Sequence, residues 1–148
     1  MAKQVYMAGP FFSETQNEKA GRLEKALEAH PQVSGFFSPR KHQYEEFELF
    51  SPEWQVAAYE SDVAAIDACD VVVAIADFDN QDADSGTAWE IGYAHAKGIP
   101  VVVIKEDEAV TLNLMIAKSL TAYLHSVEAV ADYDLENLPV VPYDGQVI

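Results

Sequence analysis

Two acidic residues near the middle of the chain, Asp84 and Glu90, have the side chains and the setting for covalent chemistry. Both follow an apolar run at residues 71–76, and Glu90 falls in the first turn or so of a helix predicted to begin near Gly86. Because a helix N-terminus stabilises negative charge, we expect Glu90 to be ionised at neutral pH and able to attack an electrophilic sugar carbon. Asp84 would add a second carboxyl group with a different protonation state. In the alternative interpretation, Glu90 only complements the helix dipole.

A second informative segment, residues 9–12, follows the first predicted strand and contains the adjacent aromatic residues Phe11 and Phe12. The segment has a single glycine, and the chain has neither a G-x-G-x-x-G nor a Walker pattern, so a dinucleotide or nucleoside triphosphate site is unsupported. Paired phenylalanines at the mouth of a pocket suit stacking on a flat ring such as a nucleobase. In the alternative interpretation both are core residues.

The residues that usually bind metals are poorly arranged for that purpose. The loop at residues 77–86 holds four aspartates, but its spacing does not match a calcium-binding loop. Cys69 is the one cysteine, which excludes an internal disulfide and a cysteine cluster, and we expect a buried structural thiol. Four histidines show no ligand spacing, namely His30, His42, His95 and His125. We therefore predict no metal and no cofactor.

The composition limits the classes of partner. The 148 residues fit one domain, residues 1–148, with a single core. Twenty-five acidic residues face nine basic ones, and the net charge of −16 repels nucleic-acid polymers and anionic membranes. No apolar run reaches the roughly 18 residues that a membrane span needs, and the N-terminus lacks signal-peptide organisation. These features favour a cytoplasmic protein that binds a neutral small molecule.

The predicted strands alternate with helices. Two apolar runs, residues 71–76 and 99–104, are typical of strands buried on both faces of a parallel sheet. Three further strands are predicted at residues 5–9, 36–38 and 121–124. The pattern predicts an α/β fold with a five-stranded parallel sheet flanked by helices, in a flavodoxin-like (Rossmann-like) order. Ligands bind such sheets at the switch point in strand order, which here lies between the first and third strands.

Local signals mark the helices. Ser13 and Gln16 form a capping-box pattern before a helix that ends near Pro31. Ser51 and Pro52 begin a second helix, and Thr111 is the predicted cap of a helix that runs to about Leu120. A further helix is predicted from residue 87 to residue 97, residues 39–50 are predicted to form a long loop, and the tail carries no helix or strand prediction.

Three segments resemble the nucleoside 2-deoxyribosyltransferases of lactobacilli and related bacteria. They are residues 6–12 (YMAGPFF), residues 84–94 (DSGTAWEIGYA) and residues 112–115 (LNLM). The resemblance extends from Tyr6 to the C-terminus, and the three segments together are far more specific than any one alone.

The resemblance implies an activity and a nucleophile. The family's nucleophilic glutamate falls on Glu90, which would attack the anomeric carbon of a 2′-deoxynucleoside, release the base and hold a deoxyribosyl ester. A second free nucleobase would then attack that carbon, which makes the reaction ping-pong with net retention. The transition state would resemble an oxocarbenium ion, as in retaining glycosidases.

The resemblance also implies roles for six other residues. Tyr6 would orient the nucleophile, and Asp62 would donate a proton to the departing base, which requires a raised pKa. Gln43 would contact the base and Asp84 the sugar. Two residues, Asn113 and Met115, would reach into the pocket of a neighbouring subunit. The family typically forms hexamers built from dimers, so a homohexamer is expected.

Each role has a structural alternative. Tyr6 could simply pack in its strand, Met115 could be a core residue, and Asp62 could pair with a surface lysine. Gln43 could be an ordinary loop residue, and Asn113 could only begin its helix. Some family members end in an aromatic residue whose carboxylate lines the site, whereas this chain ends in Ile148, so a role for its carboxylate is open.

Base preference and reaction type also remain open. Motif residues around Asp84 and Asn113 look like the purine-restricted branch, whereas the short loop at residues 39–51 does not. Purine-only exchange and purine-and-pyrimidine exchange are therefore both retained. One rival activity is a 2′-deoxynucleoside 5′-monophosphate N-glycosidase, in which water replaces the acceptor base. Another is a non-catalytic flavodoxin-like binding module, in which Glu90 would be dispensable.

Overall fold

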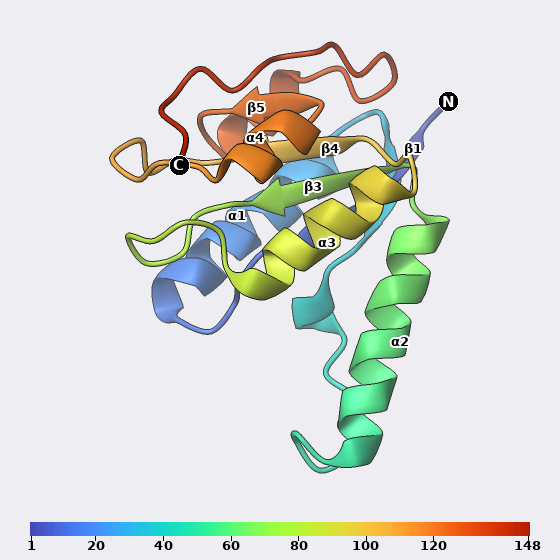
Figure 1. The fold of residues 1–148 in the computed structure, drawn as a ribbon. Helices are drawn as coiled ribbons and strands as arrows, with labels where there is room; N and C mark the ends of the chain where they lie inside the picture. Colours follow the sequence, from blue (N-terminus) through green and yellow to red (C-terminus); the bar gives the residue numbers. More distant parts are fainter.

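A computed structural model describes residues 1–148, and its five strands form one parallel sheet in the order β2-β1-β3-β4-β5 (Figure 1). The strands are β1 (Lys3–Ala8), β2 (Val33–Phe37), β3 (Val71–Ile75), β4 (Val101–Ile104) and β5 (Ala122–Leu124). The α-helices are α1 (Glu14–Ala29), α2 (Pro52–Ala68), α3 (Ser85–Ala96) and α4 (Leu114–Ser119). The predicted α/β, flavodoxin-like arrangement is confirmed.

The central strands form because their residues are β-branched, apolar and covered on both faces. Every residue of β3 and β4 is buried. One core cluster packs beneath α1 and includes Leu23 and Leu27, and the opposite cluster packs beneath α3 and includes Ile91. Figure 1 shows α1 and α3 on opposite faces of the sheet, while α2 projects past its edge. The sheet thus separates two distinct cores.

Helix starts match the local signals with two corrections. Ser13 and Gln16 form the predicted capping box of α1, and Ser51 caps α2. The predicted cap at Thr111 is wrong, because the Asn113 side chain accepts from the Met115 amide and α4 starts at Leu114. The first turn of α3 also comes two residues earlier than predicted, with Asp84 as its cap.

The tail is more ordered than its composition suggests. Residues Glu128–Asp132 form a 3₁₀ helix, and another short one, Pro39–Lys41, interrupts the predicted long loop. The last residue, Ile148, pairs with the segment that leads into α4, where its amide donates to the Leu112 carbonyl at 3.2 Å. No helix combines the length and the apolar character that crossing a membrane would require.

The order of the sheet brings the loops after β1 and β3 together. β1 pairs with β3 in parallel, with Ala8 opposite Ala74, so both strands end at the same edge. Gly9 follows at φ 157, and a Cβ there would lie 3.2 Å from the Ile75 Cβ. A side chain at residue 9 would hold the two strand ends apart. The ends of β1 and β3 therefore lie close together at the predicted switch point.

Candidate active site

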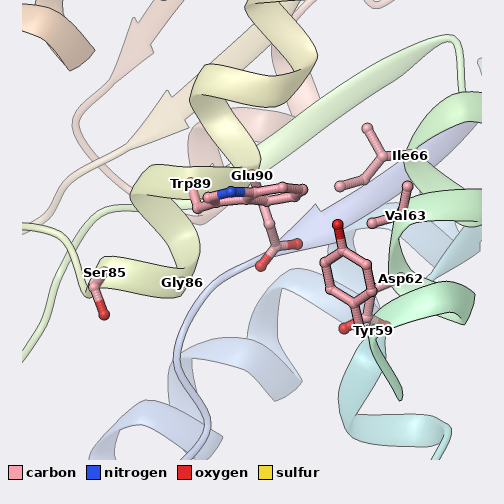
Figure 2. A pocket seen from close by; sticks show the side chains of 8 residues that line it. All are labelled: Tyr59, Asp62, Val63, Ile66, Ser85, Gly86, Trp89 and Glu90. Carbon is pink, nitrogen blue, oxygen red and sulfur yellow. The ribbon is translucent and has the colours of Figure 1, made fainter. Parts of the chain in front are cut away.

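Glu90 projects from α3 toward α2 and lines a pocket of about 390 Å³ (Figure 2). α2 contributes four residues on one face of the helix, and α3 contributes its N-terminal turn and the residues around Glu90. The eight lining residues are Tyr59, Asp62, Val63, Ile66, Ser85, Gly86, Trp89 and Glu90. Four of the eight are hydrophobic, and they form an apolar wall beside the carboxyl group.

Tyr6, in the C-terminal half of β1, lies close to this carboxyl group. Its side chain is fully buried, and both its hydroxyl and Glu90 Oε2 lack a hydrogen-bond partner. The hydroxyl still lowers the pKa of Glu90 through its proximity. Burial, together with the negative charges of Glu90 and Asp62, raises the pKa of Tyr6 far above its ordinary value, so the hydroxyl keeps its proton.

Burial also dominates the protonation of Glu90. It raises the pKa of this carboxyl to about 8, and the charges of Asp62 and Asp84 act in the same direction. The expectation that Glu90 is ionised at neutral pH in the free protein is therefore wrong. Glu90 is the sixth residue of α3, beyond the first turn where the helix dipole is strongest, so loss of hydration outweighs the dipole.

Asp62 stands on α2 at the junction of two pockets. It lines the pocket that holds Glu90 and also a second one of about 290 Å³. Burial raises its pKa to about 6. A raised pKa is the property expected of a residue that gives a proton to a leaving group. A surface ion pair with lysine, the structural alternative for Asp62, is absent.

The second pocket contains the predicted base-contacting residues. Phe11 and Phe12 stack with ring centroids 5.4 Å apart, and Phe12 is 72% exposed, so the alternative that both are core residues is wrong. Gln43 lies in the same wall, where its amide nitrogen donates to the carbonyls of Pro39 and Arg40 at 3.3 and 2.9 Å. These bonds leave the side-chain carbonyl oxygen of Gln43 free.

Asp84 is used by its own helix. One carboxylate oxygen accepts from the Thr87 amide at 3.1 Å and from the Thr87 hydroxyl at 2.7 Å, and the other accepts from the Gly86 amide at 3.3 Å. Asp84 is close enough to raise the pKa of Glu90 but does not line the pocket. Its predicted contact with a sugar would have to share oxygens that already cap α3.

Asn113 and Met115 lie away from both pockets within this chain. Asn113 caps α4, and Met115 is 76% exposed, so the alternative that Met115 is a core residue is wrong. The chain therefore unites Tyr6, Asp62 and Glu90, with Gln43 close by, but leaves these two residues outside.

No lysine or arginine lines either pocket, although His42 lies in the second one. The chain contains no group of three or more histidine, cysteine, aspartate or glutamate side chains arranged to hold a metal ion. Cys69 is buried, and its pKa is raised by burial to about 11, as a structural thiol requires. The site consists of uncharged aromatic and aliphatic walls around carboxyl groups.

Comparison with known proteins identifies the family. The model of the nucleoside 2-deoxyribosyltransferase family matches residues 5–137. The chain belongs to this family. A nucleoside deoxyribosyltransferase of Limosilactobacillus fermentum is 33% identical over 133 residues, which cover 82% of this chain and 78% of the relative. One from Lactobacillus johnsonii is 28% identical over 152 residues, which cover 95% and 99%.

Solved structures give the same result. The 2-deoxyribosyltransferase of Bacillus psychrosaccharolyticus is 34% identical, with a TM-score of 0.84 over 95% of this chain and 98% of that one. A CMP N-glycosidase of Clostridium botulinum is 20% identical, with a TM-score of 0.52 over 90% and 99%, and shares the fold alone. The chain is thus an enzyme with nucleoside deoxyribosyltransferase activity.

Sequence reasoning missed three aromatic residues that line the two pockets. Tyr59 and Trp89 wall the pocket of Glu90, with ring centroids 6.0 Å apart, and Tyr44 lines the second pocket. Tyr59 shares a helix face with Asp62, and Trp89 adjoins Glu90, so helical spacing could have found both. Nothing in the sequence around Tyr44 signals its position.

Proposed function

We propose that this enzyme moves a 2-deoxyribosyl group between nucleobases through an ester bond to Glu90. The observation that carries the proposal is the Glu90 carboxyl group in a pocket with an apolar wall, and a second titrating carboxyl, Asp62, where this pocket meets an aromatic one. The first pocket would take the sugar of a 2′-deoxynucleoside and the second its base.

The first half-reaction breaks the glycosidic bond. A carboxylate oxygen of Glu90 bonds to the anomeric carbon as the bond from that carbon to the base nitrogen breaks. The departing base takes both electrons of that bond and a proton from Asp62. The second half-reaction reverses these steps with another base, returning the proton to Asp62 and the carboxylate to Glu90. No atom is left over, so the two bases simply exchange.

For these two half-reactions, Asp62 and Glu90 together must carry one proton. With pKa values of about 6 for Asp62 and about 8 for Glu90, the two groups together hold one proton near neutral pH. The proton favours Glu90 in the free protein, and the reactive arrangement needs it on Asp62. Because the two groups interact, the values belong to the pair as a whole. Substrate binding would then have to favour the reactive arrangement.

A free nucleoside suits the site better than a nucleoside monophosphate. Neither pocket is lined by lysine or arginine, and the amides at the start of α3 already bond to Asp84. A 5′-phosphate near Glu90 would meet the charges of Asp84 and Asp62 instead of a cation. The monophosphate N-glycosidase alternative therefore lacks its phosphate site in this chain.

Completion of the site by a neighbouring subunit is part of the proposal. Asn113 and Met115 lie outside the pocket of their own chain, and Met115 projects into solvent. α2 also exposes the apolar side chains of Val56 and Tyr59, which a second copy would cover. A homohexamer built from dimers, with these two residues reaching a partner's sugar pocket, accounts for both features.

The activity is tested by mixing the protein with 2′-deoxyinosine and free adenine, without phosphate or metal. We expect deoxyadenosine and hypoxanthine by chromatography from the wild type. Glu90→Ala should be at least about 1,000-fold slower because it lacks the nucleophile. Glu14→Ala, an exposed glutamate in the first turn of α1, is the matched control and should exchange normally. Thymine and cytosine as acceptors in the same mixture define the base range.

Three other outcomes would replace the proposal. Hypoxanthine without deoxyadenosine would indicate hydrolysis, and therefore an N-glycosidase. No reaction with purine or pyrimidine donors would leave a binding module as the better account, and full exchange activity in Glu90→Ala would exclude Glu90 as the nucleophile. Intact-mass measurement after acid quenching adds an independent check, because the ester predicts wild-type protein heavier by one deoxyribosyl group.

A further inference from the structure

Three buried side-chain polar atoms lack a hydrogen-bond partner, and all three belong to residues around the two pockets. Two of them, the Tyr6 hydroxyl and Glu90 Oε2, face the proposed covalent step. The third is the Tyr44 hydroxyl, for which that step has no use. A buried hydroxyl without a partner opposes folding, so native proteins seldom keep one without a reason.

The backbone of Tyr44 is also unfavourable. Its φ of 51° lies in the left-handed region, which large side chains rarely adopt. The Tyr44 carbonyl accepts from the Phe47 amide at 3.1 Å, which holds the turn in place. Strained backbone conformations concentrate where a protein binds or reacts. Tyr44 therefore combines two unfavourable features at one position in the wall of the second pocket.

The hydrogen bonds of the neighbouring residue, Gln43, leave the pocket without a donor for a ring nitrogen of the base. A free amide side chain can read a base with both a donor and an acceptor. Here the amide nitrogen of Gln43 already donates to two backbone carbonyls, so only its carbonyl oxygen can meet a base. A base edge such as that of adenine or cytosine places an amino group beside a ring nitrogen. The oxygen suits the amino group, and the ring nitrogen still needs a donor.

We propose that Tyr44 reads the nucleobase, its hydroxyl donating to a ring nitrogen while the Gln43 carbonyl accepts from the adjacent amino group. The inference rests on the proposed base exchange and predicts that bases with this pair of groups bind more tightly than bases that lack it, such as hypoxanthine. The hydroxyl is covered in the free protein, so the segment from Tyr44 to Phe50 must shift as the base enters. Phe50 ends that segment with a second left-handed backbone, at φ 64.

The other polar side chains of this pocket already have contacts or another proposed role. His42 is exposed to water, and its ring stacks on Phe37 with centroids 4.2 Å apart, which fixes its plane. Asp62 is reserved for the nitrogen that leaves the sugar. Tyr44 is thus the donor whose partner is missing.

The test measures inhibition of exchange by free adenine in the wild type, in Tyr44→Phe and in Tyr133→Phe. Tyr44→Phe should bind adenine about 5–10-fold more weakly, the range for one lost hydrogen bond, and should melt at the same temperature or higher. Tyr133→Phe is the matched control. Its hydroxyl donates to the Pro139 carbonyl on the opposite face of the sheet, so it should melt lower and bind adenine normally.

Deaza analogues identify the contact. The 1-, 3- and 7-deazaadenines each lack one ring nitrogen, and one of them should bind equally to the wild type and to Tyr44→Phe. Unchanged adenine inhibition in Tyr44→Phe, or an equal loss for adenine and all three analogues, would overturn the assignment while leaving base exchange intact. A wild type that exchanges no base would overturn both proposals.

Discussion

Two glutamates on opposite faces of the sheet, the buried Glu24 and the half-buried Glu90, have very different surroundings. Glu24, on α1, bonds to the Arg40 guanidinium at 2.6 and 3.1 Å and accepts from the Ser38 hydroxyl at 2.9 Å. Burial alone would raise its pKa, but these partners outweigh burial and lower it. Glu90, on α3, has no comparable partner, and its pKa rises to about 8.

The contrast extends beyond these two residues. On the α1 face, His30 is buried but bonds to the Tyr133 carbonyl and the Gln32 amide. The three unpartnered buried atoms all belong to the other side, around the pockets between α2 and the sheet. A satisfied face contributes stability, whereas an unsatisfied one keeps groups available for substrate. Polar groups that are buried without hydrogen-bond partners therefore mark the half of the molecule that holds the pockets.

Among substitutions that distinguish the two faces of the sheet, we expect the largest effect on activity at Asp62. Asp62→Asn keeps the shape of the side chain but cannot protonate a departing base, so exchange should slow by about 100–1,000-fold. Steady-state rates with 2′-deoxyinosine and adenine measure this loss. Melting temperature should change little, since an uncharged amide is easier to bury than a carboxylate. Exchange within threefold of the wild type would exclude Asp62 as the proton donor.

The pH dependence of kcat/KM should be bell-shaped. Below about pH 6 both carboxyl groups hold protons, and above about pH 8 neither does, so only the range between them provides the required single proton. Each limb should fall about tenfold per pH unit. A rate that stays flat between pH 5 and pH 9 would contradict the shared proton.

Stability should reveal the uncompensated carboxylate at Glu90. Because the folded-state pKa is raised, folding favours the protonated form, and wild-type stability is lost as pH rises from about 4.5 toward 8. Glu90→Gln mimics the protonated form and should be more stable than the wild type by about 2 kcal/mol at pH 7.5, allowing for relaxation of the site. Urea unfolding at pH 4.5 and pH 7.5 measures the difference. An equal difference in unfolding free energy between Glu90→Gln and the wild type at pH 4.5 and pH 7.5 would argue against a raised pKa of Glu90.

The smallest effect, in the opposite direction, is expected on the α1 face. Arg40→Met leaves Glu24 with Ser38 alone and should cost about 1 kcal/mol near neutral pH, because Arg40 is partly exposed. The lowered pKa of Glu24 means that this contribution is present above its unfolded value and is lost as pH falls, so the variants should converge near pH 3. A loss that persists at pH 3 would have to come from packing.

Much of this architecture follows from short-range signals. The Ser13 capping box and the proline at residue 52 mark the starts of α1 and α2, and two apolar runs indicate central strands. The switch-point rule then places the loops after β1 and β3 together. The starts of α3 and α4 are displaced, because Asp84 caps α3 and Asn113, not Thr111, caps α4.

The properties of the site depend on tertiary burial and are harder to foresee. Position in α3 suggested an ionised Glu90, yet packing against α2 and Tyr6 reverses that expectation. Asp84 looked like a sugar ligand, but the start of its helix depends on both of its oxygens. The left-handed backbone of Tyr44 has no local sequence signal at all.

One base pocket, which meets the sugar pocket at Asp62, has a kinetic consequence for the proposed exchange. The base that leaves and the base that enters must use the same walls, so neither can wait beside the other. A free base at high concentration would also occupy the unreacted enzyme and keep the donor nucleoside out. Rates should therefore rise with acceptor concentration, pass through a maximum and then decline. Synthesis with this enzyme would run best when the acceptor is fed slowly.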